Sequence, residues 1–307
     1  MTFISAQNIS KEFAQTKALD TINIDIAKSE IFGLLGPNGA GKTTFIRILN
    51  QIFTPDSGQI FINDNPLQNT DIQRIGYLPE ERGLYKKMKV GEQVLYFASL
   101  KGMNNYEAKK ELAFWFDRLE ITDWKNKKVE ELSKGMQQKI QFITSVIHKP
   151  EILILDEPFS GFDPVNANTI KQEILRLKQE GTTIILSTHN MNSVEELCDS
   201  IALIHQSKKI LHGSMHSVRN QFASNKFEIT YTGYYDKFLT SLTTSYKILE
   251  QKQENGITTI RIELTEEIPS NDVIKHLMNS GSINSFTRII PSMNDIFIEA
   301  VNSHISE

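Results

Sequence analysis

The residues with the clearest chemical potential form a glycine-rich loop that ends in a lysine and two threonines. Residues 36–44 spell Gly-Pro-Asn-Gly-Ala-Gly-Lys-Thr-Thr and fit the pattern G-x-x-x-x-G-K-[ST]. Glycines let the backbone wrap closely around an anion, so that successive N–H groups point at phosphate oxygens. We expect the Lys42 amine to reach the terminal phosphates of a nucleotide and the Thr43 hydroxyl to bind Mg²⁺. The expected nucleotide-binding residues of this loop are Gly36, Pro37, Asn38, Gly39, Ala40, Gly41, Lys42, Thr43 and Thr44.

Two adjacent carboxylates, Asp156 and Glu157, follow the apolar run Ile152–Leu155. Such a pair is often only part of a solvated loop, but a phosphate loop upstream in the same chain favours a catalytic role. Asp156 is expected to hold Mg²⁺ through a water molecule. Glu157 is the next residue, so its side chain points in a different direction from that of Asp156. It is the candidate general base for an attacking water. Together the two motifs predict a nucleoside triphosphatase.

The composition is that of an ordinary globular protein long enough for two domains. The chain has 307 residues, of which 39% are hydrophobic and 23% are charged. Its formal net charge of −4 gives no electrostatic case for non-specific nucleic-acid binding. The single cysteine, Cys198, fits a reducing compartment. No signal peptide is visible, and no apolar run approaches the roughly 20 residues that span a bilayer. We therefore expect a cytoplasmic protein that reaches a membrane through a partner.

Short apolar runs alternate with helical stretches up to about residue 220, which predicts an α/β fold. The expected buried strands are 30–35, 74–78, 151–155, 182–187 and 200–205. The expected helices are 42–50, 91–100, 106–119, 135–147 and 166–180. The glycine-rich loop and the carboxylate pair then each follow a buried strand directly.

A different pattern begins near residue 225. Polar and apolar side chains alternate over 226–232, 246–251 and 257–265, and Asn255–Gly256 is a strong signal for a hairpin turn. The expected remaining elements are a helix over 270–279, a strand over 283–290 and an amphipathic helix over 293–302. These elements predict a small α+β domain, for which a ferredoxin-like fold is one candidate. We expect domains at 1–223 and 224–307, with a helical subdomain at about 85–145 inside the first.

Further motifs resemble those of the ABC-type ATPases. Residues 132–139, Leu-Ser-Lys-Gly-Met-Gln-Gln-Lys, resemble the family's signature L-S-G-G-Q and precede Asp156 in the order that the family uses. The segment Ser160–Asp163 resembles the D-loop. His189 matches the family's switch histidine, and Phe13 lies where the family places an aromatic ring that stacks on adenine. The resemblance implies a P-loop NTPase core with a mixed sheet and a helical subdomain.

The resemblance also implies a partner copy and a membrane protein. The nucleotide, ATP, would lie between two ATPase subunits in head-to-tail orientation, either identical or different. Signature residues Ser133 and Gly135, with Met136 beside them, would face the γ-phosphate held by the other copy, and Ser160 and Asp163 would form the D-loop. His189 would contact the same phosphate and act with Lys42 and Glu157. Closing on ATP and opening after hydrolysis would drive an integral-membrane permease at the inner face of the cell membrane.

The sequence departs from the family pattern in two places. Where the family has the glutamine of its Q-loop, this chain has Glu80, a carboxylate that could ligate metal or orient water but adds negative charge beside the triphosphate. In the signature, Met136 replaces glutamine and Lys134 replaces glycine. Neither change removes a catalytic group, so we expect an active ATPase whose metal ligands come from Thr43, Asp156 and Glu80.

Two segments resemble one subgroup of the family. The residues Tyr77–Tyr85 and the C-terminal segment Pro291–Val301 are similar to ATPases of the sodium-extrusion type, which serve exporters with a separate membrane subunit. A groove near Glu80–Val90 is then expected to receive the permease, with Leu84, Tyr85 and Met88 as apolar anchors. The alternative is that these side chains simply pack the helical subdomain.

Two other classes of function compete with the exporter subunit. A soluble ABC ATPase acting on ribosomes or DNA usually carries two nucleotide domains or a long coiled-coil insertion, whereas this chain has one phosphate loop and no heptad run. A binding module with an inactive site is disfavoured by the intact Lys42, Asp156, Glu157 and His189. The role of the C-terminal domain and the transported substrate stay open, because a fold does not specify cargo.

Overall fold

A computed structural model describes residues 2–81, 83–223, 225–233, 246–254, 256–264, 273–275, 278 and 281–305. By contacts between residues the chain forms two compact units, Met1–Met215 together with Ala300–Glu307, and His216–Glu299. The predicted boundaries, 1–223 and 224–307, differ from this division in the residues after Met215 and in the last eight. The two units are described separately.

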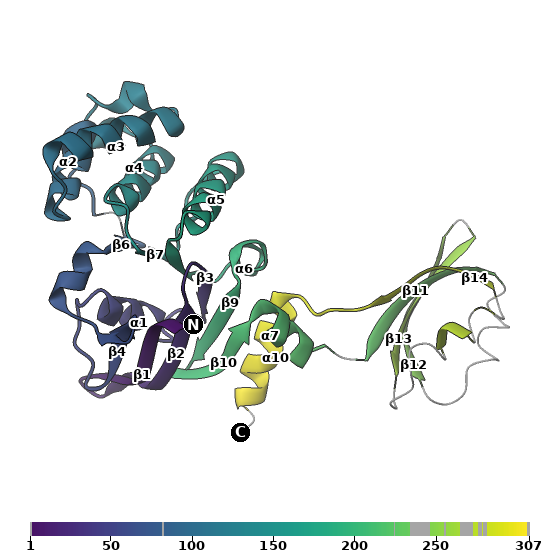
Figure 1. Cartoon of the computed structure of the whole chain (residues 1–307). Coiled ribbons are helices and arrows are strands. Elements are labelled where there is room, and N and C mark those ends of the chain that lie inside the picture. The colour runs from purple at the N-terminus through teal and green to yellow at the C-terminus, as the bar shows by residue number, and fades with distance from the viewer. Residues whose placement is uncertain are drawn as a thin grey trace. The chain divides into compact units, whose positions relative to one another are not determined.

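A six-stranded sheet organises the first unit, and its strand order is β10-β9-β3-β8-β7-β6 (Figure 1). These strands are β3 (Ile31–Leu35), β6 (Ile75–Leu78), β7 (Ile152–Asp156), β8 (Thr183–Ser187), β9 (Ser200–His205) and β10 (Lys208–Ser214). All neighbours pair in parallel except β10, which runs antiparallel to β9. β3, β7 and β8 are buried along their whole length, as expected for parallel strands covered on both faces. The five predicted strands of this region are confirmed.

A second, antiparallel sheet in the order β2-β1-β4-β5 was not among the expected strands. It consists of β1 (Thr2–Phe13), β2 (Thr16–Ala27), β4 (Ser57–Ile62) and β5 (Asn65–Pro66). The pairing of β1 with β2 is interrupted by register shifts, and Asn8 and Thr21 adopt positive φ angles of 53° and 52°. These irregularities break the alternation of polar and apolar side chains that marks a regular strand. Ile24 of β2, Phe45 and Ile154 of β7 belong to one buried cluster, which places the core of the unit between the two sheets.

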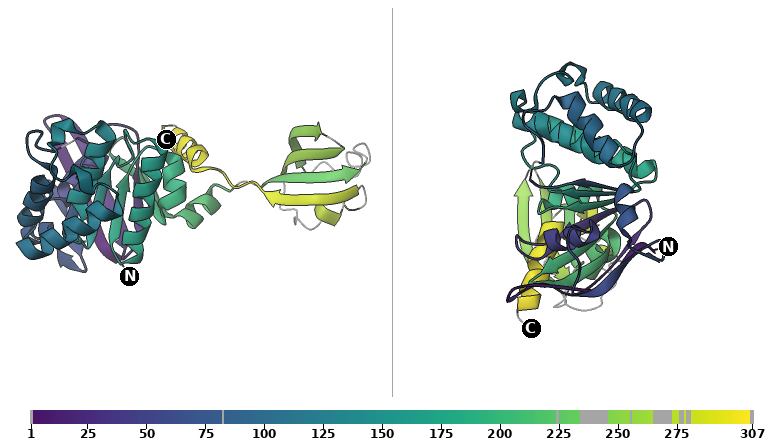
Figure 2. Two further views of the ribbon diagram at one scale, coloured as in Figure 1. Left: turned by 90° about the horizontal axis from the view of Figure 1, so that it is seen from above. Right: turned by 90° about the vertical axis from the view of Figure 1, so that its left-hand side faces the viewer.

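The helices of the first unit lie within one or two residues of their predicted bounds. They are α1 (Lys42–Leu49), α2 (Val90–Leu100), α3 (Asn105–Arg118), α4 (Lys134–Val146) and α5 (Pro164–Gln179), followed by the short α6 (Met191–Leu197). The views in Figures 1 and 2 place α2, α3 and α4 together at one end of this unit and the antiparallel sheet at the other. In the described part of the chain, no helix is long and apolar enough to cross a membrane.

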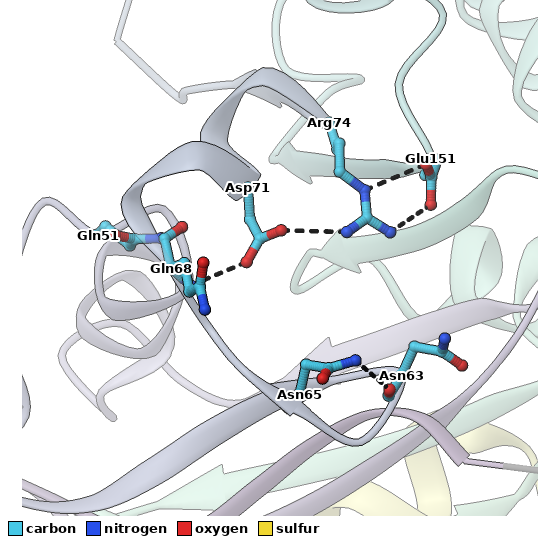
Figure 3. A network of polar contacts seen from close by, with 7 residues as sticks. All are labelled: Gln51, Asn63, Asn65, Gln68, Asp71, Arg74 and Glu151. Carbon is cyan, nitrogen blue, oxygen red and sulfur yellow. Dashed lines mark hydrogen bonds and ion pairs between the residues drawn. The ribbon is translucent and has the colours of Figure 1, made fainter.

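A polar network fixes the starts of the two strands that lead into the candidate site (Figure 3). The Arg74 guanidinium donates to Glu151 at 2.6 and 3.1 Å and to Asp71 at 3.0 Å. Asp71 in turn accepts the backbone N–H of Gln68 at 2.8 Å. Arg74 immediately precedes β6 and Glu151 immediately precedes β7, so the network supports the register in which Leu78 pairs with Leu155. The residues that follow both strands therefore emerge side by side.

The second unit contains a four-stranded antiparallel sheet in the order β12-β13-β11-β14. Its strands are β11 (Lys226–Gly233), β12 (Tyr246–Glu254), β13 (Ile257–Leu264) and β14 (Gly281–Arg288). Glu254 pairs with Ile257, which confirms the hairpin predicted from Asn255–Gly256. The third strand of this unit lies between the first and the second, which is the order of a ferredoxin-like sheet. Most of the helix expected over 270–279 lies outside the described residues.

Two helices flank this sheet along the chain. They are α7 (Met215–Gln221) before it and α10 (Met293–Ile305) after it. The helix expected over 293–302 is confirmed and continues to Ile305. By its contacts α10 is divided, with residues up to Glu299 in the second unit and residues from Ala300 in the first.

Candidate nucleotide-binding site

The glycine-rich loop connects β3 to α1 with a backbone that requires glycine at two positions. Gly36 and Gly41 have φ angles of 148° and 116°. A Cβ atom at Gly36 would lie 2.2 Å from the Ile204 carbonyl oxygen, and one at Gly41 would lie 2.4 Å from that of Ala18. The loop is therefore held against β9 and β2, and Gly41 forms the N-terminal cap of α1. Its N–H groups gather at a helix N-terminus, where an anion is stabilised.

A cavity of about 390 Å³ opens above this loop. It is lined by Thr16, Lys17, Ala18, Asn38, Gly39, Gly41, Lys42, Thr43, Thr44, Glu80, Asp156, Glu157 and Ser207. The loop and carboxylate residues predicted from two distant motifs thus meet in one cavity, joined by the segment after β6. Of the predicted loop residues, Gly36, Pro37 and Ala40 are not among those that line the cavity.

Lys42 is buried at the base of the cavity. Its amine donates to the backbone carbonyls of Gly36 at 2.7 Å and Pro37 at 3.1 Å. Burial lowers the pKa of Lys42, while the negative charges of Glu157, Asp156 and Glu80 oppose this effect. The amine is therefore held inside the loop, within the field of three carboxylates.

Asp156 ends β7 with only 3% of its surface exposed. Burial raises the pKa of its carboxyl group, the charges of Glu80 and Glu157 act in the same direction, and Lys42 opposes them. A cation beside Asp156 would stabilise the ionised form, and carboxylate and hydroxyl oxygens are the ligands that Mg²⁺ prefers. In the described residues no three His, Cys, Asp or Glu side chains form a metal cluster, so a Mg²⁺ ion here would need Thr43, the nucleotide or water as further ligands. The donor set fits Mg²⁺ shared with a phosphate.

Glu157 and His189 contact each other directly. Glu157 adopts a left-handed backbone with φ 49°, and its N–H donates to the Ser187 carbonyl at 2.9 Å. Its Oε1 lies 2.6 Å from the His189 Nδ1 and accepts the His189 N–H at 3.0 Å, while its Oε2 accepts the Thr188 hydroxyl at 3.1 Å. The Glu157 side chain is 13% exposed and that of His189 is 70% exposed. The structure thus joins the predicted base to the predicted switch histidine.

Phe13 precedes the cavity-lining residues Thr16 and Lys17 in the sequence but does not itself line the cavity. Its ring is 40% exposed and meets the Phe53 ring edge-on at 5.2 Å. Phe13 ends β1, and Thr16 and Lys17, which follow the turn, do line the cavity. The Lys11 amine lies over the Phe13 ring, 5.5 Å from its centroid, so a flat ring would have to meet the remaining exposed part of Phe13.

The residues predicted to form the signature and the D-loop lie together and do not line the cavity of their own chain. Ser133 caps α4 by accepting the Met136 N–H at 3.3 Å, and Asp163 caps α5 by accepting two N–H groups at 3.0 Å. The Gln138 amide donates to the Ser160 carbonyl, which ties the two segments. Ser133, Ser160 and Asp163 are exposed, whereas Gly135 and Met136 are partly buried. These residues are not brought to the phosphate loop of the same chain.

Glu80 follows β6 and is the third carboxylate of the cavity. The backbone around it is fixed by Gln141 of α4, whose amide donates to the carbonyls of Pro79 at 2.8 Å and Glu81 at 3.3 Å. Gln141 is buried, so these bonds are shielded from water. The pKa of the neighbouring Tyr77 is raised to about 12 by burial, with the charges of Asp156 and Glu80 acting in the same direction.

Among the site residues that sequence analysis missed, besides Thr16 and Ala18 of the cavity lining, four make contacts between residues distant in sequence. Lys17 and Ser207 line the cavity, and the Ser207 hydroxyl donates to the Lys17 carbonyl at 2.5 Å. Thr188 holds Glu157, and Gln141 holds the loop at Glu80. None of them belongs to a motif, and each acts through a contact between residues far apart in sequence. A single sequence carries no signal for such contacts.

Comparisons with known proteins agree with this geometry. Residues 19–160 match the family model of the ABC transporter, and residues 213–301 match that of the C-terminal domain of ATP-binding proteins like DrrA1-3. The chain is 42% identical to the ABC transporter ATP-binding protein YhaQ of Bacillus subtilis, over 98% of this chain and 99% of that protein. It is 38% identical to the ABC transporter ATP-binding protein NatA of the same organism, over 66% of this chain and 84% of that protein.

A solved structure supports the same assignment. The ATP-binding subunit of an ABC transporter superposes with a TM-score of 0.68 and 27% sequence identity, covering 72% of this chain and 93% of that one. The fold, the phosphate loop and the relatives agree, and the chain belongs to the family of ABC transporter ATP-binding proteins.

Proposed function

We propose that the chain is the ATP-hydrolysing subunit of an ABC exporter and works with a separate integral-membrane permease. The observation that carries the proposal is the single cavity in which Lys42 and Thr43 of the phosphate loop meet Asp156 and Glu157. A phosphate cradle, a metal-binding carboxylate and a base are the parts that phosphoryl transfer to water requires.

ATP binding is assigned to the loop and its neighbours. The backbone N–H groups of 36–44 would hold the phosphates, Lys42 would neutralise their terminal charge, and the exposed Phe13 ring would stack on adenine. Thr43, Asp156 and Glu80 would hold Mg²⁺, which when bound neutralises charge on the phosphates. Asp156 is the most buried of these donors.

Hydrolysis is assigned to Glu157. Its carboxylate would take the proton of the attacking water and become a neutral acid, and the proton would leave to solvent as the site opens. Thr188 and His189 hold the side chain in place, and the exposed part of the His189 ring would contact a γ-phosphate.

A head-to-tail dimer would complete the site. Ser133, Gly135 and Met136 are not lining residues of their own cavity, and exposed Ser160 and Asp163 lie beside them. A second ATPase subunit, identical or different, could present its equivalent residues to the γ-phosphate held here. Catalysis would then depend on an interface that forms with ATP.

The permease is expected to dock on an apolar groove of about 350 Å³ in the first unit. The groove is lined by Asn50, Ile52, Ile72, Tyr77, Pro79, Gly83, Leu84, Phe97, Leu100, Lys101, Gln141, Thr144 and His148. Tyr85 is 54% exposed and stacks on Phe97 at 6.2 Å. One relative is named a resistance protein, the linearmycin resistance ATP-binding protein LnrL of Bacillus subtilis, which is 31% identical over 86% of this chain and 85% of that protein. The subunit would then work at the inner face of the membrane.

Mutation of Glu157 tests the catalytic assignment. Glu157→Gln keeps the shape of the side chain but removes the base, so we expect Mg²⁺-dependent ATP turnover to fall by about 100-fold or more while ATP binding persists. Turnover would be measured by phosphate release and binding by a fluorescent ATP analogue. Turnover retained by Glu157→Gln would refute the assignment of the base.

Capture of partners tests the transporter assignment. A tagged chain, purified from detergent-solubilised membranes of its host, is expected to recover one integral-membrane protein in stoichiometric amount. Recovery with ribosomes or DNA instead would favour the alternative of a soluble ABC ATPase. Tyr85→Ala should reduce capture of the membrane protein, whereas Tyr106→Ala, which removes an 81% exposed ring from the start of α3, should not.

A further inference from the structure

The phosphate cavity contains more negative charge than a metal-binding carboxylate and a base require. Glu80, Asp156 and Glu157 all line it, and the lysines among its lining residues are Lys42 and Lys17. Lys17 is paired with Asp20, which lies outside the lining, at 2.6 Å. Lys42 donates to loop carbonyls. Among the described residues that line the cavity, a triphosphate without a cation therefore meets three carboxylates and one lysine that is not paired with an acid.

Hydrolysis requires a metal-binding carboxylate and a base, and Asp156 and Glu157 can fill these two roles. The role of Glu80 therefore needs a further explanation. Asp156 is buried at a strand end and Glu157 is held by Thr188 and His189. Glu80 is exposed at the cavity, and its charge acts on Lys42, on Asp156 and on Tyr77. The charge of Glu80 therefore acts on the buried residues Lys42 and Asp156, although Glu80 itself is exposed.

Glu80 is also held in place. The two hydrogen bonds from Gln141 fix the carbonyls on either side of it, at Pro79 and Glu81. β6 pairs with β7 up to Leu78 and Leu155, so the residues after β6 emerge beside Asp156. Because its backbone is fixed at both neighbours, Glu80 keeps its charge at the cavity rather than turning the loop away from it.

We propose that Glu80 makes nucleotide binding conditional on a divalent cation. Its carboxylate repels the phosphates of a metal-free nucleotide, and the same carboxylate attracts a nucleotide that carries a divalent metal ion. Two like charges a few ångströms apart in a cleft repel more strongly than in bulk water. Glu80 thus acts as a specificity-determining residue that admits the metal complex and discriminates against free ATP. This inference rests on the proposed function, in which the cavity binds a nucleotide and Glu80 is one of the ligands of Mg²⁺.

The next residue supplies a matched control. Glu81 is exposed, carries the same charge and lies one position further along, but it is not a lining residue of the cavity. Its charge is also not among those that act on Lys42 or Asp156. Glu81→Gln therefore changes the net charge of the protein by the same amount as Glu80→Gln without changing the cavity.

The experiment measures equilibrium binding of a fluorescent ATP analogue to the full chain, once in EDTA and once in excess Mg²⁺. For Glu80→Gln, affinity in EDTA should rise by about five-fold or more, and the ratio of the affinities with and without Mg²⁺ should fall by about ten-fold. Glu80→Asp should keep the ratio of the unchanged chain, as should Glu81→Gln. Thermal unfolding would verify that the exposed substitutions leave the fold intact.

Each outcome decides between supporting and rejecting the inference. An unchanged ratio in Glu80→Gln, or the same change in Glu81→Gln, would overturn it while leaving nucleotide binding established. Affinity that falls equally in EDTA and in Mg²⁺ would overturn it too, because the side chain would then be a plain contact. Failure of the unchanged chain to bind nucleotide even in Mg²⁺ would reject the proposed function and this inference together.

Discussion

At the scale of single residues, the phosphate loop contains two glycines that differ in the space around them. Gly39 and Gly41 both have positive φ angles, 79° and 116°. A Cβ at Gly39 meets nothing within 4 Å, whereas one at Gly41 would lie 2.4 Å from the Ala18 carbonyl oxygen. Backbone strain is thus common to both positions, and steric overlap is confined to Gly41.

We therefore predict different costs for the two alanine substitutions. Gly39→Ala should lower the free energy of unfolding by about 1 kcal/mol, because only the left-handed backbone is strained. Gly41→Ala should lower the free energy of unfolding by about 1–3 kcal/mol more than Gly39→Ala does, because its added methyl group overpacks the site. Denaturant unfolding of both variants without nucleotide measures the difference, and equal losses would contradict the close approach of Gly41 to Ala18.

His148 predicts a pH dependence of stability. Burial lowers its pKa to about 4, the charge of Lys101 acts in the same direction, and a contact with the Ile75 carbonyl opposes them. The unfolded chain, with a histidine pKa of about 6.5, then binds more protons than the folded chain between pH 6.5 and 4. The contribution of His148 to the free energy of unfolding has its full value above pH 6.5. It falls by about 3 kcal/mol as the pH drops to 4.

Removing the histidine should flatten this dependence. In His148→Leu the free energy of unfolding should fall less steeply between pH 7 and 5 than in the unchanged chain. His216→Leu, which removes an exposed histidine, serves as the control and should keep the original slope. Identical slopes in all three proteins would show that His148 is not held neutral by its surroundings.

Local sequence could indicate the candidate catalytic residues because the roles proposed for them demand particular residue types at fixed spacing. Asp156 ends an apolar strand and Glu157 follows it, while the loop that leads to Lys42 follows another apolar strand, so both the motifs and their context were visible. Thr188 and Gln141 were not visible, since a hydroxyl and an amide bind whatever backbone or carboxylate the fold brings near. Their partners lie 31 and 62 residues away in the chain.

At the scale of elements, α4 connects the signature to the loop at Glu80. Ser133 caps its first turn, and Gln141, two turns later, holds the carbonyls of Pro79 and Glu81. Thr144, near its end, and His148, just after it, line the apolar groove. One rigid helix therefore touches the residues expected to face a partner copy, the cavity loop and the expected permease groove.

Gln141→Leu should release the loop without unfolding the helix. The loss of two hydrogen bonds is expected to cost about 1–2 kcal/mol of stability. Gln137→Leu is a matched control on the same helix, because the Gln137 amide also donates to two carbonyls, those of Val129 and Leu132. Amide hydrogen exchange in a peptide spanning 75–90 should accelerate only in Gln141→Leu; acceleration in both variants, or in neither, would count against the link.

Strands with a regular residue pattern could be predicted from the sequence, whereas strands with an irregular pattern could not. Fully buried parallel strands appear in the sequence as continuous apolar runs, and β3, β7 and β8 were found that way. β1 and β2 were not found, because their pairing shifts register at several points and the apolar residues lose their period of two. The hairpin of β12 and β13 was predicted correctly, because the turn sequence Asn255–Gly256 favours a hairpin without any tertiary contact.

At the scale of the whole molecule, the two units are interleaved in sequence. Residues 300–307 return to the first unit after the second unit has been completed. A sequence with no repeat or linker signal at that point gives no hint of this return, which is why the predicted boundary assigned the whole C-terminal segment to the second domain. A truncation near residue 223 would therefore remove part of the nucleotide-binding unit together with the accessory domain.

The last turns of α10 are expected to stabilise the nucleotide-binding unit. Ala300 is 8% exposed, and the His304 ring packs edge-on at 6.0 Å against that of His205 at the end of β9. Ending the chain after Glu299 removes these contacts and should cost about 1–2 kcal/mol, or several degrees of Tm for a unit of this size. Ending it after Ile305 removes none of the contacts named here and should leave Tm unchanged.

The readout must distinguish the two units, and ATP provides the means. The unfolding transition that rises with added Mg²⁺-ATP belongs to the unit that binds it, because a ligand of the folded state stabilises that state alone. We expect this transition, and not the other, to shift down when the chain ends after Glu299. If the ATP-responsive transition keeps its Tm in both truncated chains, the C-terminal turns do not contribute to the nucleotide-binding unit. A shift in that transition would mean instead that any deletion meant to test the accessory domain must keep α10 in place.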